Sequence, residues 1–189
     1  MDKVTKRYIR NDTDLKAVKA GFRFDKDKAD HVVEFFSYLR HTIGEWAGKP
    51  LKLLKWQKED VIYPLFGWVD KAGLRRFRTA YIEIAKKNGK STLCSGLALY
   101  LLAGDNEPGA QVYTAAASRD QATIVYREAS RMATTSPLLR EYVLPRDSVK
   151  HLSIPSTNSF LKALAADSFR QEGINWNGLI FDELHAQPD

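Results

Sequence analysis

The chain has 189 residues, of which 44% are hydrophobic and 28% are charged, and it carries a formal net charge of +6. This length supports one substantial core with a smaller appendage, and the composition is that of an ordinary globular protein. The sequence has no long apolar run for a membrane helix or signal peptide, and its single cysteine, Cys94, excludes an internal disulfide. The positive charge permits contact with a polyanion without demonstrating it.

The N-terminal part of the chain is predicted to be mainly helical. Apolar residues between Ala29 and His41 follow the helical period, and a second short helix is expected over residues 56–65. The turn at residues 70–73 separates two candidate strands, which predicts a β-hairpin over residues 66–77. We expect residues 1–52 to form a small helical segment and residues 53–189 to form the core.

Strands and helices alternate in the predicted core. In order, we expect a strand at residues 80–84, a buried helix at 91–102, a strand at 111–116, a helix from 118 to about 133, a hairpin over 149–165 and a strand at 179–181. The helix expected from residue 118 starts with a capping box formed by Ser118 and Gln121. This order predicts an α/β fold with a mainly parallel central sheet flanked by helices.

A phosphate-binding pattern stands between the first predicted strand and the buried helix. The sequence IAKKNGKST at residues 84–92 matches x-x-x-x-x-G-K-[ST], with Ile84 at the position of the usual first glycine. Gly89 lets backbone N–H groups approach a phosphate, Lys90 supplies a mobile positive charge, and Ser91 offers a hydroxyl to Mg²⁺. The pattern predicts a site for ATP and Mg²⁺, the alternative being a basic turn. The expected contact residues are Ala85, Lys86, Lys87, Asn88, Gly89, Lys90, Ser91 and Thr92.

Two carboxylates follow the last predicted strand. Asp182 and Glu183 would lie at the edge of the sheet where ligands of open α/β folds bind. In a phosphate-loop enzyme the first would hold Mg²⁺ and the second would act as the general base on the attacking water. The alternative is a solvated strand end.

Trp56 and Gln57 form a candidate adenine contact ahead of the loop. An aromatic ring can stack on a base, and a glutamine amide offers one donor and one acceptor to the adenine edge. The residues alone favour Trp56 as a packing residue.

Taken together, five segments make the chain resemble the N-terminal part of the large subunit of tailed-bacteriophage terminases. They are HTIGEWAGKP (41–50), LKWQ (54–57), AKKNGKS (85–91), YTAAASRDQA (113–122) and FDELHA (181–186). The resemblance extends from about Phe22 onward, and in that family the missing first glycine is normal. It implies a phosphate-loop NTPase of the ASCE type.

The resemblance also implies roles for individual residues. Gln57 with Trp56 would recognise adenine, Lys86 would sense or stabilise the γ-phosphate, and Arg119 either contacts DNA or is merely a solvated residue at a helix start. The implied catalytic residues are Glu183, Lys90 and Lys86, and the implied metal ligands are Ser91 and Asp182.

The implied function is the ATPase part of a genome-packaging motor that drives double-stranded DNA into a procapsid. The implied partners are DNA, the portal protein, the small terminase subunit and further copies in a ring, in the host cytoplasm and away from membranes. Family members continue far beyond the position of Asp189, so we expect a truncated chain with weak ATPase activity and no nuclease domain. The alternatives are a helicase or repair ATPase, or a nucleotide-binding fragment without significant turnover.

Overall fold

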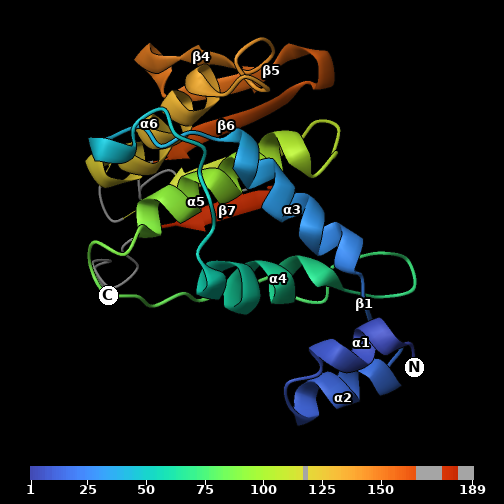
Figure 1. Ribbon diagram of the computed structural model, residues 1–189. Coiled ribbons are helices and arrows are strands. Elements are labelled where there is room, and N and C mark those ends of the chain that lie inside the picture. The colour runs from blue at the N-terminus through green and yellow to red at the C-terminus, as the bar shows by residue number, and fades with distance from the viewer. Residues whose placement is uncertain (117–118, 165–175, 183–189) are drawn as a thin grey trace, which may run out of the picture. The chain divides into compact units, whose positions relative to one another are not determined.

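The computed structural model describes residues 1–116, 119–164 and 176–182 (Figure 1). The chain divides into two compact units. The N-terminal unit comprises Met1–Phe36 and Lys52–Glu83, and the sheet unit comprises Ser37–Leu51 and the described residues of Ile84–Asp189. This division does not coincide with the boundary predicted after residue 52, so the extent of the core as residues 53–189 stays a prediction.

The N-terminal unit is built from short elements around an aromatic cluster. The Phe24 ring stacks on Tyr8 with ring centroids 3.7 Å apart and meets Trp68 edge-on at 5.7 Å. A Cβ on Gly67 would lie 2.4 Å from the Phe24 ring, so only glycine fits this position. The elements are α1 (Lys3–Tyr8), α2 (Asp12–Lys19), β1 (Arg23–Phe24), α3 (Lys26–Tyr38), a π-helical segment (Gln57–Ile62), α4 (Tyr63–Gly67) and β2 (Trp68–Val69).

The hairpin predicted over residues 66–77 is present in short form. An antiparallel bridge joins Val69 to Arg75, and the backbone bonds from the Asp70 N–H to the Leu74 carbonyl at 3.0 Å and from the Arg76 N–H to the Trp68 carbonyl at 2.9 Å flank it. β2 also pairs antiparallel with β1, which brings Phe24 against Trp68 and was not predicted. The short helix predicted over residues 56–65 is present as the π-helical segment and α4.

The sheet unit contains a five-stranded sheet in the order β4-β5-β6-β3-β7. β3 pairs parallel with both β6 and β7, whereas the pairs β4–β5 and β5–β6 are antiparallel. The α/β class is confirmed, and the sheet is mixed because the predicted hairpin joins it through β5 and β6. The strands are β3 (Gln111–Ala115), β4 (Leu144–Arg146), β5 (His151–Ile154), β6 (Ser159–Leu164) and β7 (Gly178–Phe181).

Two long helices cover the sheet. α5 (Lys90–Leu99) continues as a π-helical turn to Gly104, and it packs against α6 (Arg119–Thr135). The Ser95 hydroxyl donates to the Val125 carbonyl at 3.0 Å and fixes this contact. Where the structure describes the chain, no helix is both long enough and apolar enough to cross a bilayer.

The strand predicted at residues 80–84 is not formed. No described strand pairs with this segment, and Tyr81 is 73% exposed. An apolar run becomes a stable strand only when a neighbour satisfies its backbone hydrogen bonds, and β7 is the last described strand on its side of the sheet. The apolar pattern of this segment therefore does not by itself determine whether a strand forms.

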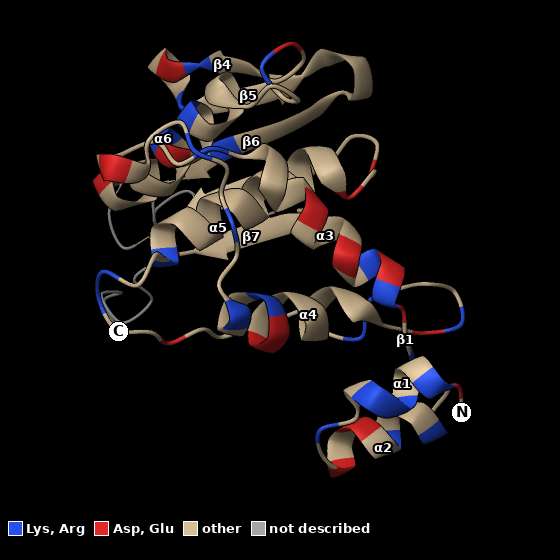
Figure 2. Cartoon of the chain, in the orientation of Figure 1, with Lys and Arg blue, Asp and Glu red and all other residues tan. Residues whose placement is uncertain are grey.

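Charge is divided unequally between the two units (Figure 2). The N-terminal unit carries sixteen Lys and Arg against eleven Asp and Glu, a net charge of +5. In the full sequence, residues 37–51 and 84–189 together carry thirteen against twelve, a net charge of +1. The positive excess of the chain therefore belongs to the N-terminal unit and not to the unit with the phosphate-loop sequence.

Candidate nucleotide site

The loop before α5 has the backbone of a phosphate-binding turn. Gly89 adopts φ 76° and ψ 21°, in the left-handed region that favours glycine, and Lys87 also has a positive φ of 66°. The Asn88 amide donates to the Ala85 carbonyl at 3.1 Å and to the Lys86 carbonyl at 3.4 Å, so the turn is closed from within. Residues 85–89 are exposed, which leaves the loop accessible to a ligand.

The first turn of α5 offers donors to an anion. The first hydrogen bond of this helix runs from the Leu93 N–H to the Gly89 carbonyl at 2.9 Å, and no side chain caps the helix. N–H groups of a first helical turn have no acceptor inside the helix, and the helix dipole adds positive potential there. The half-buried residues Ser91 and Thr92 lie in this turn. The arrangement is suited to a phosphate group.

Asp182 is held at the carboxyl end of β7. Its backbone N–H donates to the Ala115 carbonyl at 2.8 Å, which extends the ladder between β7 and β3 by one step. Asp182 is only 5% exposed, unusual for an ionisable residue. The sheet thus fixes a buried carboxylate at the predicted edge.

The structure brings Lys90 and Asp182 into direct contact. Lys90 Nζ lies 3.0 Å from Asp182 Oδ1, with the lysine side chain 30% exposed and the aspartate side chain 6% exposed. The sequence predicted both residues for the site but not this ion pair, since it assigned one to phosphate and the other to metal. The contact shows that the two positions, far apart in the sequence, are neighbours in the fold.

Cys94 follows Lys90 by one turn of α5 and is a packing residue. Burial, with a smaller contribution from the negative charge of Asp182 and an opposing one from Lys90, raises the pKa of its thiol to about 12. The thiol is therefore protonated at neutral pH and is a poor nucleophile.

The donor set fits a magnesium–nucleotide complex. A hydroxyl from Ser91 and a carboxylate from Asp182 are the oxygen ligands that Mg²⁺ takes together with phosphate oxygens. Lys90 and the N-terminal turn of α5 supply positive charge for the phosphates. Glu183 lies outside the described residues, and the side chain of Arg119 is likewise not described.

Gln57 has a structural partner in the N-terminal unit. Its side chain is buried, and its Oε1 accepts a hydrogen bond from the Leu54 N–H at 2.9 Å. This is the contact of a capping box, in which a residue of the first turn reaches back to the helix start. Trp56 is half-buried beside it. The adenine-recognition role of both residues stays a prediction.

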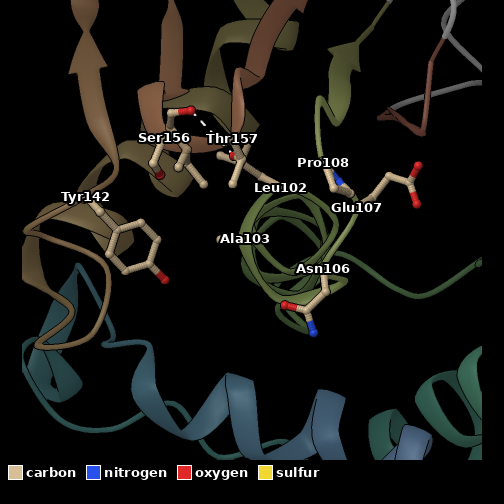
Figure 3. A pocket seen from close by; sticks show the side chains of 9 residues that line it. Leu102, Ala103, Asn106, Glu107, Pro108, Tyr142, Ser156 and Thr157 are labelled. Atoms are coloured by element: carbon tan, nitrogen blue, oxygen red, sulfur yellow. Dashed lines mark hydrogen bonds between the residues drawn. The ribbon is translucent and has the colours of Figure 1, made fainter.

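A pocket of about 300 Å³ lies at the far end of the helix that begins at the loop (Figure 3). Leu102 and Ala103 line it from the π-helical turn after α5, and Tyr142, Ser156 and Thr157 face them. Helical rise separates this turn from Gly89 by roughly 20 Å. The pocket is therefore distinct from the candidate nucleotide site.

The structural role of one predicted contact residue was not foreseen from the sequence. Asn88 was expected to contact the nucleotide, and its amide in addition closes the loop through two carbonyls. Asparagine within a turn is a known signal for such side-chain to backbone bonds, so the residue type carried the information.

Known proteins with similar sequences and folds are phage terminases. Residues 55–189 match the family described as "Terminase large subunit, ATPase domain". The terminase large subunit of Enterobacteria phage HK97 is 33% identical over 141 residues, 74% of this chain and 27% of that protein. The crystal structure of the HK97 bacteriophage large terminase is similar with a TM-score of 0.67 and 29% identity, over 82% of this chain and 30% of that one. The chain thus covers less than a third of the length of either relative.

Proposed function

The chain belongs to the family of terminase large subunit ATPase domains, and we propose that it couples ATP hydrolysis to the translocation of double-stranded viral DNA into a procapsid. The observation that carries the proposal is the meeting of Lys90 with the buried Asp182 at the first turn of α5. A glycine in the left-handed conformation, a lysine, a hydroxyl and a carboxylate are thereby grouped at one edge of the sheet. Such a group supports phosphate and metal binding.

Each residue of the group has a distinct task in this proposal. The backbone of residues 85–92 surrounds the phosphates, and Lys90 leaves Asp182 to neutralise them. Ser91 and Asp182 hold Mg²⁺, which when bound neutralises the charge that develops on the transferred phosphoryl group. Lys86, exposed on the loop, approaches the γ-phosphate. Glu183 orients and deprotonates the attacking water.

The partners follow from the proposed motor. They are double-stranded DNA, the portal protein, the small terminase subunit and further copies of the chain in a ring on the procapsid, in the host cytoplasm and without a membrane. A second candidate is a fragment that binds ATP without significant turnover.

Turnover by the purified 189-residue chain tests the proposal. We expect slow, Mg²⁺-dependent hydrolysis of ATP and a further fall of roughly 10²–10⁴-fold for Glu183→Gln. ATP binding by this variant is expected to be unchanged, because only the base is altered. Equal hydrolysis by both proteins would reject Glu183 as the base, and binding without any hydrolysis by the parent would favour the second candidate.

Adenine recognition is tested by Gln57→Glu. This substitution keeps an oxygen for the Leu54 N–H, replaces the Nε2 donor that would contact the base by an acceptor, and adds a negative charge. We expect the preference for ATP over GTP to fall by roughly tenfold, as for the loss of one specific hydrogen bond. Unchanged selectivity at unchanged thermal stability would assign Gln57 to capping alone.

A further inference from the structure

Three of the sixteen cations of the N-terminal unit lie together on one short helix. Lys3, Lys6 and Arg7 are all exposed on α1, and the only carboxylate in the first ten residues is Asp2. With 3.6 residues per turn, the three cations lie within an arc of roughly 100°. They therefore form one continuous face, which we call the α1 basic face.

The opposite side of α1 is anchored. Thr5 is buried, and its hydroxyl accepts the Phe24 N–H at 2.9 Å and donates to the Asp2 carboxylate at 2.7 Å. Tyr8 stacks on Phe24 on the same side. Thr5 and Tyr8 thus define the packed side of α1, and the α1 basic face lies on its exposed side.

The cations of this face have no acidic partner among the described residues, as is also true of the exposed Lys16 and Lys19 on α2. Elsewhere in the unit, Arg10 pairs with Asp60 at 2.9 Å and Arg76 pairs with Asp14 at 2.7 Å. No ion pair joins Lys3, Lys6 or Arg7 to any described carboxylate. Their charge is thus available to an external anion.

Helix stability does not explain the face. Lys6 and Arg7 lie in the last turn, where the helix dipole favours cations, but Lys3 lies in the first turn, where it disfavours them. The charge of Lys3 therefore interacts unfavourably with the helix dipole, while it increases the positive charge of the α1 basic face.

We propose that the α1 basic face binds the phosphodiester backbone of duplex DNA. The inference rests on the proposed function, which supplies duplex DNA as the polyanion. Lysine and arginine on one face neutralise successive phosphates without reading bases, which suits a protein that moves along any sequence. The face has no exposed aromatic side chain for stacking on bases, in accord with duplex and not single-stranded DNA.

The test is binding of a fluorescent duplex of mixed sequence to the full chain, measured by anisotropy at several salt concentrations. The variant K3Q/K6Q/R7Q removes the face. We expect roughly ten- to a hundredfold weaker binding near ~50 mM salt, and a log–log salt slope that is smaller by about 2 to 3, one phosphate contact for each cation.

Two matched variants control for total charge and for folding. R127Q/R131Q/R140Q removes three exposed cations of the sheet unit and is expected to leave the salt slope nearly unchanged. K3R/K6R/R7K keeps the charge on α1 and is expected to retain binding. The proposal would be overturned if duplex affinity fell equally in the sheet-unit variant or did not fall in the α1 variant. It would also be overturned if the parent chain did not bind duplex DNA.

Parallel measurements separate this proposal from the proposed function. ATP binding by K3Q/K6Q/R7Q is expected to match the parent, because Lys90 and Asp182 are untouched. If the parent chain binds ATP and the α1 variant keeps full DNA affinity, the role of the α1 basic face is rejected. The proposed function is not affected by that result. Binding to phosphatidylserine vesicles that is stronger than duplex binding, and lost in the α1 variant, would overturn the assignment of DNA.

Discussion

Each unit of the molecule contains a buried ion pair, and the two pairs are built differently. In the N-terminal unit Arg76 donates to Asp14 at 2.7 Å and to the Thr13 carbonyl at 3.2 Å, and its guanidinium lies over the Phe77 ring. In the sheet unit Lys90 reaches Asp182 from a side chain that is 30% exposed, three times the 10% exposure of Arg76. Both side chains of the first pair are nearly buried, whereas the lysine of the second pair is partly exposed to solvent.

The difference separates a structural charge pair from an exchangeable one. Arginine offers a rigid fork that can hold several acceptors at once, and lysine is a point charge on a flexible stem. A buried pair is costly to break when one partner is deleted, but it can be exchanged when a ligand replaces that partner. The contrast also shows that the net charge of the chain says little about its nucleotide site.

Removing the Arg76–Asp14 pair is expected to have the largest effect. Arg76→Ala leaves the buried Asp14 carboxylate without its cation, and we expect a loss of about 3–5 kcal/mol in the free energy of unfolding, measured by urea denaturation. Arg10→Ala is the control, because the Arg10–Asp60 pair is exposed and such pairs contribute about 0–1 kcal/mol. Similar losses in both variants would break the distinction between buried and surface pairs.

Removing the cation of the exchangeable pair is expected to affect binding more than folding. Lys90→Ala should lower the affinity for ATP by at least about a hundredfold, because each charge-assisted hydrogen bond contributes roughly 1.5–3 kcal/mol. Titration with a fluorescent ATP analogue measures it. Lys87→Ala, on the same loop, is the control and should change the affinity only a few-fold. Unchanged affinity in Lys90→Ala would remove the lysine from the site.

Removing the carboxylate should give an effect whose sign depends on Mg²⁺. Without Mg²⁺, Asp182→Asn frees Lys90 and removes a negative charge near the phosphates, so ATP should bind roughly tenfold more tightly. With Mg²⁺ present, the variant lacks a metal ligand. Mg²⁺ should therefore raise its affinity for ATP much less than it raises that of the parent. Calorimetric titration in EDTA and in excess Mg²⁺ measures both. Equal Mg²⁺ dependence in the two proteins would contradict the assignment of Asp182.

Features with local causes were predictable from the sequence. The helix after the loop, the strand at residues 111–115, the hairpin of β5 and β6, and β7 follow from apolar periodicity and turn residues. The position of Asp182 at a strand end was predictable for the same reason. Ile84 at the usual glycine position did not hide the loop, because the neighbouring motifs supported it, and the match to the terminase family confirmed that resemblance.

Features that depend on distant partners were not predictable. The strand expected at residues 80–84 lacks a described neighbour, and the pairing of β2 with β1 was not predicted alongside the short hairpin. Both differences arise because the choice of a distant partner is a property of the folded chain and not of the segment. The contact of Lys90 with Asp182 was missed for a similar reason, since each residue alone fits a role toward the ligand.

The hydrogen bond from the Asp182 N–H to the Ala115 carbonyl gives the candidate site a stationary reference point. The main chain at Asp182 is held by the ladder to β3, in the interior of the sheet, whereas the lysine ammonium is carried by four flexible methylenes. Rearrangement on ligand entry is therefore expected to begin on the loop side. Asp182 then serves as the frame against which the displacement of Lys90 can be measured, for instance by a spectroscopic probe on the loop.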